Sequence, residues 1–107
     1  MATFYITEFN QLAVAFNPRG LETMPAPLAA SITAEQSVAI TGASATSSAF
    51  NPKTVFILVN TDVACSIAFG STASPAVAVT TAHRLSANES RFYGVAGNNN
   101  IAVIANT

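Results

Sequence analysis

Apolar and polar residues alternate along the N-terminal part of the chain with the period of two that is typical of β-strands. In residues 3–9 the even-numbered positions fall on one face and the odd-numbered positions on the other, and residues 11–16 alternate in the same way. The sequence Asn-Pro-Arg-Gly at 17–20 predicts a turn, because Pro fixes φ and Asn caps the chain locally. The sequence Met-Pro-Ala-Pro at 24–27 predicts an extended connector, because its two prolines exclude a central strand.

This pattern divides the single predicted domain into two parts. We expect residues 1–27 to form an N-terminal β-hairpin or arm with its proline-containing connector, and residues 28–107 to form a β-sandwich body. Residues 28–50 are rich in Ala, Ser and Thr, and the best strand among them is at 36–41. Residues 29–36 fit either a strand or a short helix with a weak capping box, and we prefer the strand.

The second half of the chain has stronger strand signals. Residues 54–60 are apolar on both faces, which predicts a central strand buried on both sides. A turn at 60–62 and the apolar residues 63–70 that follow predict a β-hairpin. The Gly- and Asn-rich sequence at 96–100 predicts a tight turn, because these residues accept positive φ. Further strands are expected at 76–82, 91–95 and 101–105.

Together these signals predict an all-β protein. About seven to nine short strands, separated by regularly spaced turns, are typical of an antiparallel β-sandwich or a jelly-roll-like barrel. A chain of 107 residues is long enough to bury one such core.

The composition suggests a surface made for contact. Charged residues make up 8% of the chain, against about 25% in ordinary soluble domains. A surface of Ala, Thr, Ser and Asn is neutral and suits permanent burial against other protein, and large neutral faces usually mark contacts. The alternative is an extracytoplasmic β-domain with a polar, uncharged surface.

Charge and cysteine content disfavour several classes of protein. The net charge is −1 and the basic residues are scattered, so neither a nucleic-acid surface nor an anionic-lipid surface is expected. The apolar runs are shorter than the roughly 20 residues that span a bilayer, and no positively charged region precedes an apolar stretch as in a secretory signal. A single cysteine forms no internal disulfide, so folding does not depend on an oxidising compartment.

The sequence gives little sign of catalytic or metal chemistry. Cys65 lies in an alternating apolar stretch, where it is expected to be a small core residue, since a reactive thiol needs a nearby cation or a helix N-terminus. The only histidine, His83, ends a predicted strand beside Arg84, where it is expected to face solvent or an interface. A zinc site needs three or four ligands. We therefore expect no catalytic residues, no metal and no cofactor.

Aromatic residues gather near the N-terminus and are the candidates for a protein interface. They either anchor an arm on a neighbouring subunit, by strand addition or by aromatic contact, or pack into the domain's own core. A second, smaller patch for sugar or protein is a hypothesis for Arg91, Phe92 and Tyr93, but we prefer the interpretation that one of these strand residues is packed and its neighbours are exposed. The four N-terminal candidates are Phe4, Tyr5, Phe9 and Phe16.

Three sequences in the second half, TVFILVNTDVACSIAFG, LSANESRFYGV and NNNIAVIAN, carry a resemblance to known proteins. Over residues 54–106 the chain resembles small accessory virion proteins of tailed phages and prophages. The resemblance implies a head decoration or cement protein that binds and stabilises the capsid lattice as a homo-oligomer. A trimer suits a three-fold lattice point. The implied partners are the major capsid protein or another virion protein, and the implied location is the virion, assembled in the bacterial cytoplasm.

Two other classes of function remain open. A carbohydrate- or receptor-binding module of a phage tail or fibre would use the same β-framework, with exposed aromatic and Asn side chains as its site. An enzyme is the third class, and it would require Cys65 or His83 to take part in chemistry.

Overall fold

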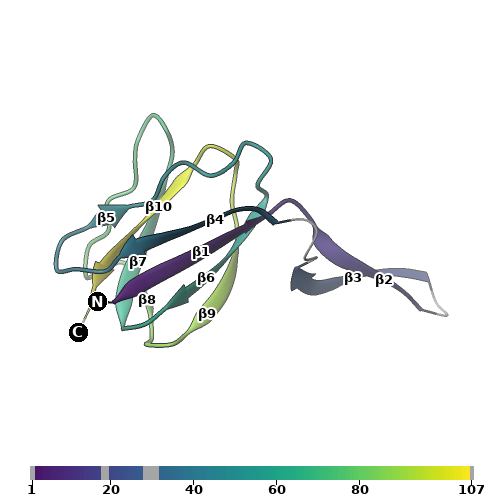
Figure 1. Ribbon diagram of the computed structural model, residues 1–107, viewed down its shortest axis with the longest axis horizontal. Coiled ribbons are helices and arrows are strands. Elements are labelled where there is room, and N and C mark those ends of the chain that lie inside the picture. The colour runs from purple at the N-terminus through teal and green to yellow at the C-terminus, as the bar shows by residue number, and fades with distance from the viewer. Residues whose placement is uncertain (1, 18–19, 28–31, 107) are drawn as a thin grey trace.

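The computed structural model describes residues 2–17, 20–27 and 32–106, and for residues 12–27 it describes the backbone alone. The described chain consists of strands joined by turns and loops, which confirms the all-β prediction (Figure 1). The strands are β1 (Thr3–Phe9), β2 (Leu12–Asn17), β3 (Gly20–Pro27), β4 (Ile32–Ala39), β5 (Ala45–Thr46), β6 (Phe56–Thr61), β7 (Cys65–Gly70), β8 (His83–Leu85), β9 (Ser90–Gly94) and β10 (Asn100–Ala105).

Two four-stranded antiparallel sheets form the body. Their strand orders are β4-β1-β6-β9 in the first sheet and β5-β10-β7-β8 in the second. The inner faces of the two sheets pack against each other, as expected for a β-sandwich. β2 and β3 form a separate two-stranded sheet that extends away from the body (Figure 1). The molecule accordingly measures 50 Å along its longest axis and 29 and 22 Å along the others.

The N-terminal strands form one long, interrupted β-ribbon, which corrects the predicted division at residue 27. β1 pairs with β4, from Thr3 opposite Ala39 to Phe9 opposite Ile32, and β2 pairs with β3 in the same nested order. β1 also pairs with β6, so it is an inner strand of the first sheet and not part of an arm. The predicted hairpin between residues 3–9 and 11–16 does not form, because β1 finds its partners inside the body.

Other expectations for this ribbon agree with the structure only in part. Asn17 lies opposite Gly20, as the predicted turn requires, although residues 18 and 19 of that turn lie outside the described residues. The connector predicted at 24–27 is wrong, because these residues are the last part of the paired strand β3; its prolines at 25 and 27 still avoid a central strand, since β3 has one pairing partner among the described strands. Strand is also the observed state from Ile32 onward, while residues 28–31 are not described.

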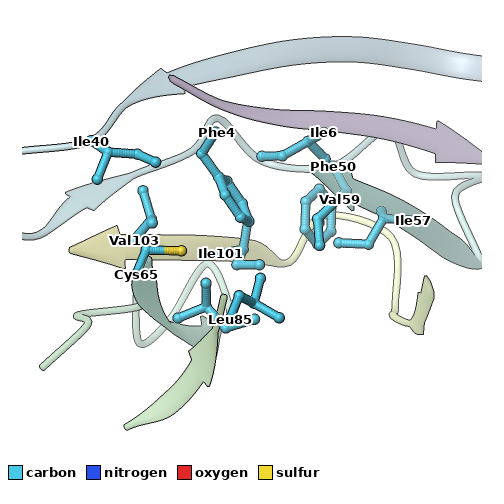
Figure 2. Packing of buried hydrophobic residues seen from close by; sticks show 11 residues of the cluster. Phe4, Ile6, Ile40, Phe50, Ile57, Val59, Cys65, Leu85, Ile101 and Val103 are labelled. Atoms are coloured by element: carbon cyan, nitrogen blue, oxygen red, sulfur yellow. The ribbon is translucent and has the colours of Figure 1, made fainter. Parts of the chain in front are cut away.

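The hydrophobic core lies between the two sheets. Figure 2 shows Phe4 and Ile6 of β1 pointing toward Ile101 and Val103 of β10, with Cys65 of β7 beside them. All five side chains are at most 1% exposed. The even-numbered positions of β1 therefore face the core, as the alternation predicts. The remaining members of this cluster are Ile40, Phe50, Ile57, Val59, Ile67 and Leu85.

The predicted hairpin at 54–70 is wrong, because β6 and β7 belong to different sheets. Thr61 ends β6 and directs the chain across the sandwich. Its N–H donates to the carbonyl of Glu89, its own carbonyl accepts from Asn88, and its hydroxyl donates to the carbonyl of Val63 at 2.6 Å. These bonds fix a corner between the sheets in place of a tight hairpin turn. β6 is an inner strand of its sheet as predicted, but its outward positions Leu58 and Asn60 are partly exposed.

In the loop 71–82, buried and exposed residues alternate although the loop forms no strand, which corrects the strand predicted at 76–82. Ala76 and Ala78 are 3% and 2% exposed, whereas Val77 is 68% exposed. The backbone N–H groups of this loop bond to side chains and not to a neighbouring strand. The Asn100 side chain accepts from the Ala76 N–H at 2.9 Å, and the Ser44 hydroxyl accepts from the Ala78 N–H at 2.9 Å. Alternating burial therefore arises here from packing on the second sheet.

The predicted tight turn at 96–100 is present. Asn98 adopts a φ of 67°, and Asn88 in the preceding turn adopts a φ of 62°. Asparagine accepts this left-handed conformation more readily than most residues.

Candidate interaction surface

The four predicted interface aromatics do not form one surface. Phe4 is completely buried in the domain's own core, so it is not available to a neighbouring subunit. Phe9 is 3% exposed, and Tyr5 is 47% exposed. Phe16 lies in β2, whose side chains are outside the described part of the structure. The prediction was wrong for Phe4 and Phe9, because β1 is an inner strand of a sheet that buries both of its faces in part.

A row of large apolar side chains crosses the outer face of the first sheet. Pairing in register places Ile32 opposite Phe9 and Phe9 opposite Phe56, and Leu58 lies opposite Phe92. Directly paired residues share a face, so these residues lie on the same side of the sheet as Tyr5. We call this surface the aromatic face; its residues are Tyr5, Phe9, Ile32, Phe56, Leu58 and Phe92.

Aromatic stacking organises the middle of this face. The rings of Phe9 and Phe56 are stacked, with centroids 5.0 Å apart and planes 12° apart. Phe92 lies 6.0 Å from Phe56 and is tilted by 54°. Phe9 and Phe56 are almost fully buried, whereas Phe92 at one end and Ile32 at the other are 47% and 43% exposed. An open groove of about 420 Å³ runs beside Tyr5, between β1 and β4.

The outer face of the second sheet provides a contrast, because the chain itself covers it. Ala102 of β10 is buried under Ala76 and Ala78 of the loop 71–82, and Ala68 and Ile104 pack against the same cluster. The small side chains let the loop lie close to the sheet. The two outer faces thus differ: one is capped by a loop of the same chain, and the other presents exposed Tyr and Phe.

A smaller aromatic cluster occupies the edge between β8 and β9. The Nε2 atom of His83 lies 2.7 Å from the hydroxyl of Tyr93, with the two rings nearly perpendicular at 87°. Phe69 packs its ring against Tyr93 at 5.2 Å. Phe69 also lines an open groove of about 410 Å³ together with Val55 and Asn99.

An ion pair lies next to this cluster. Glu89 accepts hydrogen bonds from the Ser86 N–H and from the Arg91 Nε, and these interactions, the first being the larger, hold the pKa of Glu89 below its ordinary value. The same carboxylate raises the pKa of Arg91. Burial raises the pKa of Tyr93, while the nearby Arg91 charge acts in the opposite direction. Phe92 points to the aromatic face, so the three residues 91–93 do not share one patch.

Cys65 lies in the core, as predicted. The side chain is completely buried, and this burial raises the pKa of its thiol above the ordinary value. A hydrogen bond with Thr61 lowers the pKa and the charge of Glu89 raises it, but both effects are smaller than that of burial. A thiol in this environment is held in its protonated, weakly nucleophilic form.

Glu8 is a buried polar residue whose role the sequence did not reveal. It is 1% exposed, and its carboxylate accepts from the Asn51 N–H at 2.7 Å, the Thr54 hydroxyl at 2.9 Å and the Gln36 amide at 3.2 Å. These bonds tie β1 to β4 and to the turn before β6. The available signal was the position of Glu8 on the same face as Phe4 and Ile6.

The described residues contain no group of three or more His, Cys, Asp or Glu side chains placed to hold a metal ion. They also contain no apolar helix of the length needed to cross a bilayer.

Comparison of the chain with protein-family models, with curated proteins and with solved structures finds no match. The observations that bear on function are therefore the extended ribbon of β2 and β3, the aromatic face and the low charge of the chain.

Proposed function

We propose that this chain is a structural protein of a phage virion, of the capsid decoration or cement type, which acts by making protein contacts as a homo-oligomer. The observation that carries the proposal is the β2–β3 ribbon. It has an apolar sequence, extends away from the body and pairs only with itself among the described strands.

A ribbon of this kind needs a partner. An isolated two-stranded sheet is at best marginally stable in water. In β2, Leu12, Val14 and Phe16 alternate with alanines, and the register pairs Phe16 with Leu21. Full burial of an aliphatic or phenylalanine side chain contributes about 1.5–3 kcal/mol. Contact with another protein surface would therefore stabilise the ribbon by the sum of several such burial free energies.

The rest of the molecule suits a role in a large assembly. With 8% charged residues, contact does not depend on strong electrostatic attraction, so it is expected to persist across salt concentrations. The lone cysteine is buried, so the fold is compatible with the reducing cytoplasm of a bacterial host. Many copies on one lattice multiply a modest contact into firm attachment.

The finer parts of the proposal come from the resemblance over residues 54–106. It supplies the virion as the location, the major capsid protein or another virion protein as the partner, and a trimer at a three-fold lattice point as the form of the oligomer. Closed symmetry of this kind lets one small domain contact equivalent sites.

Purified particles from the source organism test the proposal. Mass spectrometry is expected to detect the chain at a copy number comparable with that of the lattice subunits, and cryo-microscopy is expected to place it on the outer surface of the head. Particles that lack the chain, or contain it in a few copies at the tail, would refute a decoration role.

A carbohydrate- or receptor-binding module is the second candidate, favoured by the cluster of Phe69, His83 and Tyr93 beside an open groove. Tyr93→Ala and Arg91→Ala variants separate the two candidates. Loss of glycan or cell binding with normal assembly would support the binding module, whereas normal attachment to particles and no glycan binding by the wild type would exclude it.

A further inference from the structure

The aromatic face begins where the ribbon leaves the body. Phe9 is the last residue of β1 before the ribbon and Ile32 is the first residue of β4 after it, and both belong to this face. The ribbon itself extends away from the body (Figure 1). Each copy therefore has a ribbon of apolar sequence that extends from the body and, at its base, an apolar face with exposed ends.

We propose that the β2–β3 ribbon of one copy lies across the aromatic face of a second copy. This inference rests on the proposed contact-making role, and it adds the surface that receives the ribbon. The receiving residues with the largest exposed area are Tyr5, Ile32 and Phe92.

The dimensions of the two surfaces agree. β2 has six residues, which span roughly 20 Å at about 3.4 Å per residue. The first sheet has four strands, whose outer axes are roughly 14 Å apart at about 4.8 Å per spacing. The ribbon is thus long enough to cross the sheet completely and to contact both exposed ends of the aromatic row.

The chemistry of the two surfaces also agrees. Val14 and Phe16 lie two positions apart in β2 and pair in register with Thr23 and Leu21, so the alternation assigns them to one face of the ribbon, while a register shift separates Leu12 from them. The six residues of the aromatic face carry no charge, and the charged side chain beside them is Glu35, which is exposed on the edge strand β4 opposite Thr7. Contact through the six uncharged residues buries apolar area, and Glu35 at the edge of the sheet keeps its carboxylate in water, because burying an ionic group would be costly.

A second copy is the occupant, because a chain cannot place its ribbon on its own aromatic face while the strands keep their pairing. β1 and β4 hold the base of the ribbon within the sheet, and the paired strands lead outward from there. The outer face of the second sheet is already occupied by the loop 71–82. The contact joins two different surfaces, so it is reciprocal in a dimer or repeats around a closed ring.

Substitutions on each surface test the contact in the intact chain. Phe92→Asp places a charge on the aromatic face, and Val14→Asp places one on the ribbon. Each is expected to weaken self-association at least tenfold in sedimentation velocity, because loss of a buried anchor typically costs that much. The matched controls are Val77→Asp, at a 68% exposed position of the loop 71–82, and Ala15→Lys, opposite Glu22 on the other face of the ribbon. Both controls are expected to associate like the wild type.

Mixing the two defective variants gives a sharper test. The Phe92→Asp chain keeps an intact ribbon and the Val14→Asp chain keeps an intact face, so one contact can form between them. The mixture is expected to contain hetero-oligomers at concentrations where each variant alone is monomeric. A mixture that stays monomeric, or association that neither substitution weakens, would overturn the inference.

The outcome separates this inference from the proposed function. A wild-type chain that is monomeric up to high concentration, yet is present on purified heads, would refute ribbon exchange and leave the decoration role intact. An oligomer with the expected dependence on Phe92 and Val14, from a source whose particles lack the chain, would support the contact and refute the virion role. Circular dichroism of each variant confirms that a loss of association does not come from unfolding.

Discussion

The two halves of the N-terminal ribbon have the same kind of ladder but different surroundings. β1 and β4 form the proximal half, and β6 adds a further strand beside β1. β2 and β3 form the distal half, which continues the same nested pairing and has no third strand among the described residues. Alternation in the sequence looks alike in both halves. The comparison shows that a period of two predicts a strand, but it does not predict which part of the protein packs against that strand.

The difference has an energetic meaning. In the proximal half, Phe4 and Ile6 insert between the sheets and are at most 1% exposed (Figure 2). Their burial stabilises the folded monomer. Under the proposed contact role, the apolar residues of the distal half are buried by a second molecule, so their burial stabilises the oligomer. Mutations in the two halves should therefore affect two different equilibria.

The largest expected effect is on the proximal half. Phe4→Ala is expected to lower the free energy of unfolding by about 3–5 kcal/mol, because it removes a fully buried ring from the core. Phe16→Ala in the distal half is expected to leave the unfolding of the monomer nearly unchanged and to weaken self-association. Urea denaturation at low protein concentration, followed by circular dichroism, measures the first quantity. Equal loss of monomer stability in both variants would show that the halves do not differ as described.

The next effect concerns the buried carboxylate. Glu8→Ala removes the acceptor for the Asn51 N–H and the Thr54 hydroxyl, so it is expected to cost about 1–3 kcal/mol of unfolding free energy. Glu35→Ala, which removes an exposed carboxylate of β4, is the matched control and is expected to change stability by less than about 0.5 kcal/mol. A Glu8→Ala chain as stable as the wild type would mean that these hydrogen bonds contribute little.

Gly70→Ala tests how closely the loop 71–82 packs against the second sheet. A Cβ atom at this position would lie 2.3 Å from the Ala76 backbone nitrogen, so the loop 71–82 must move. We expect destabilisation of about 1–3 kcal/mol and faster hydrogen exchange of the Ala76 and Ala78 amides. Gly42→Ala is the control, since nothing lies within 4 Å of its added Cβ. Unchanged exchange would show that the loop adjusts without losing its contact with the sheet.

The smallest effect concerns pH. The pKa of Glu89 is lower in the folded protein, so the unfolded chain binds more protons at mildly acidic pH. The stabilisation is present above the unfolded pKa of Glu and is lost as the pH falls through the lower, folded value. Comparison of thermal unfolding between pH 6 and pH 3 is expected to show a smaller pH dependence for Glu89→Gln than for the wild type. An identical pH dependence in both would contradict this assignment.

Local features of the fold followed from the sequence. Alternation located β1 with the correct faces, and the prediction of tight turns was correct where Asn98 has a positive φ. These features depend on a few neighbouring residues, whose steric preferences act within the segment itself.

Long-range features did not follow, because strand periodicity contains no information on pairing partners. The Asn60–Asp62 sequence fits a hairpin turn as well as it fits a connection between the two sheets. The hydrogen bonds between Thr61 and residues 88–89 stabilise the connection between the sheets. The aromatic face is formed by residues from four strands that are distant in sequence. Its existence depends on register, which the sequence of any one strand does not specify.

The complete burial of Cys65 also makes the protein convenient for spectroscopy. Because its only thiol is inaccessible in the folded state, a cysteine introduced on the ribbon would be the sole site for a maleimide dye or a nitroxide. Energy transfer or dipolar coupling between labelled copies could then follow the ribbon during assembly, without first removing a native thiol.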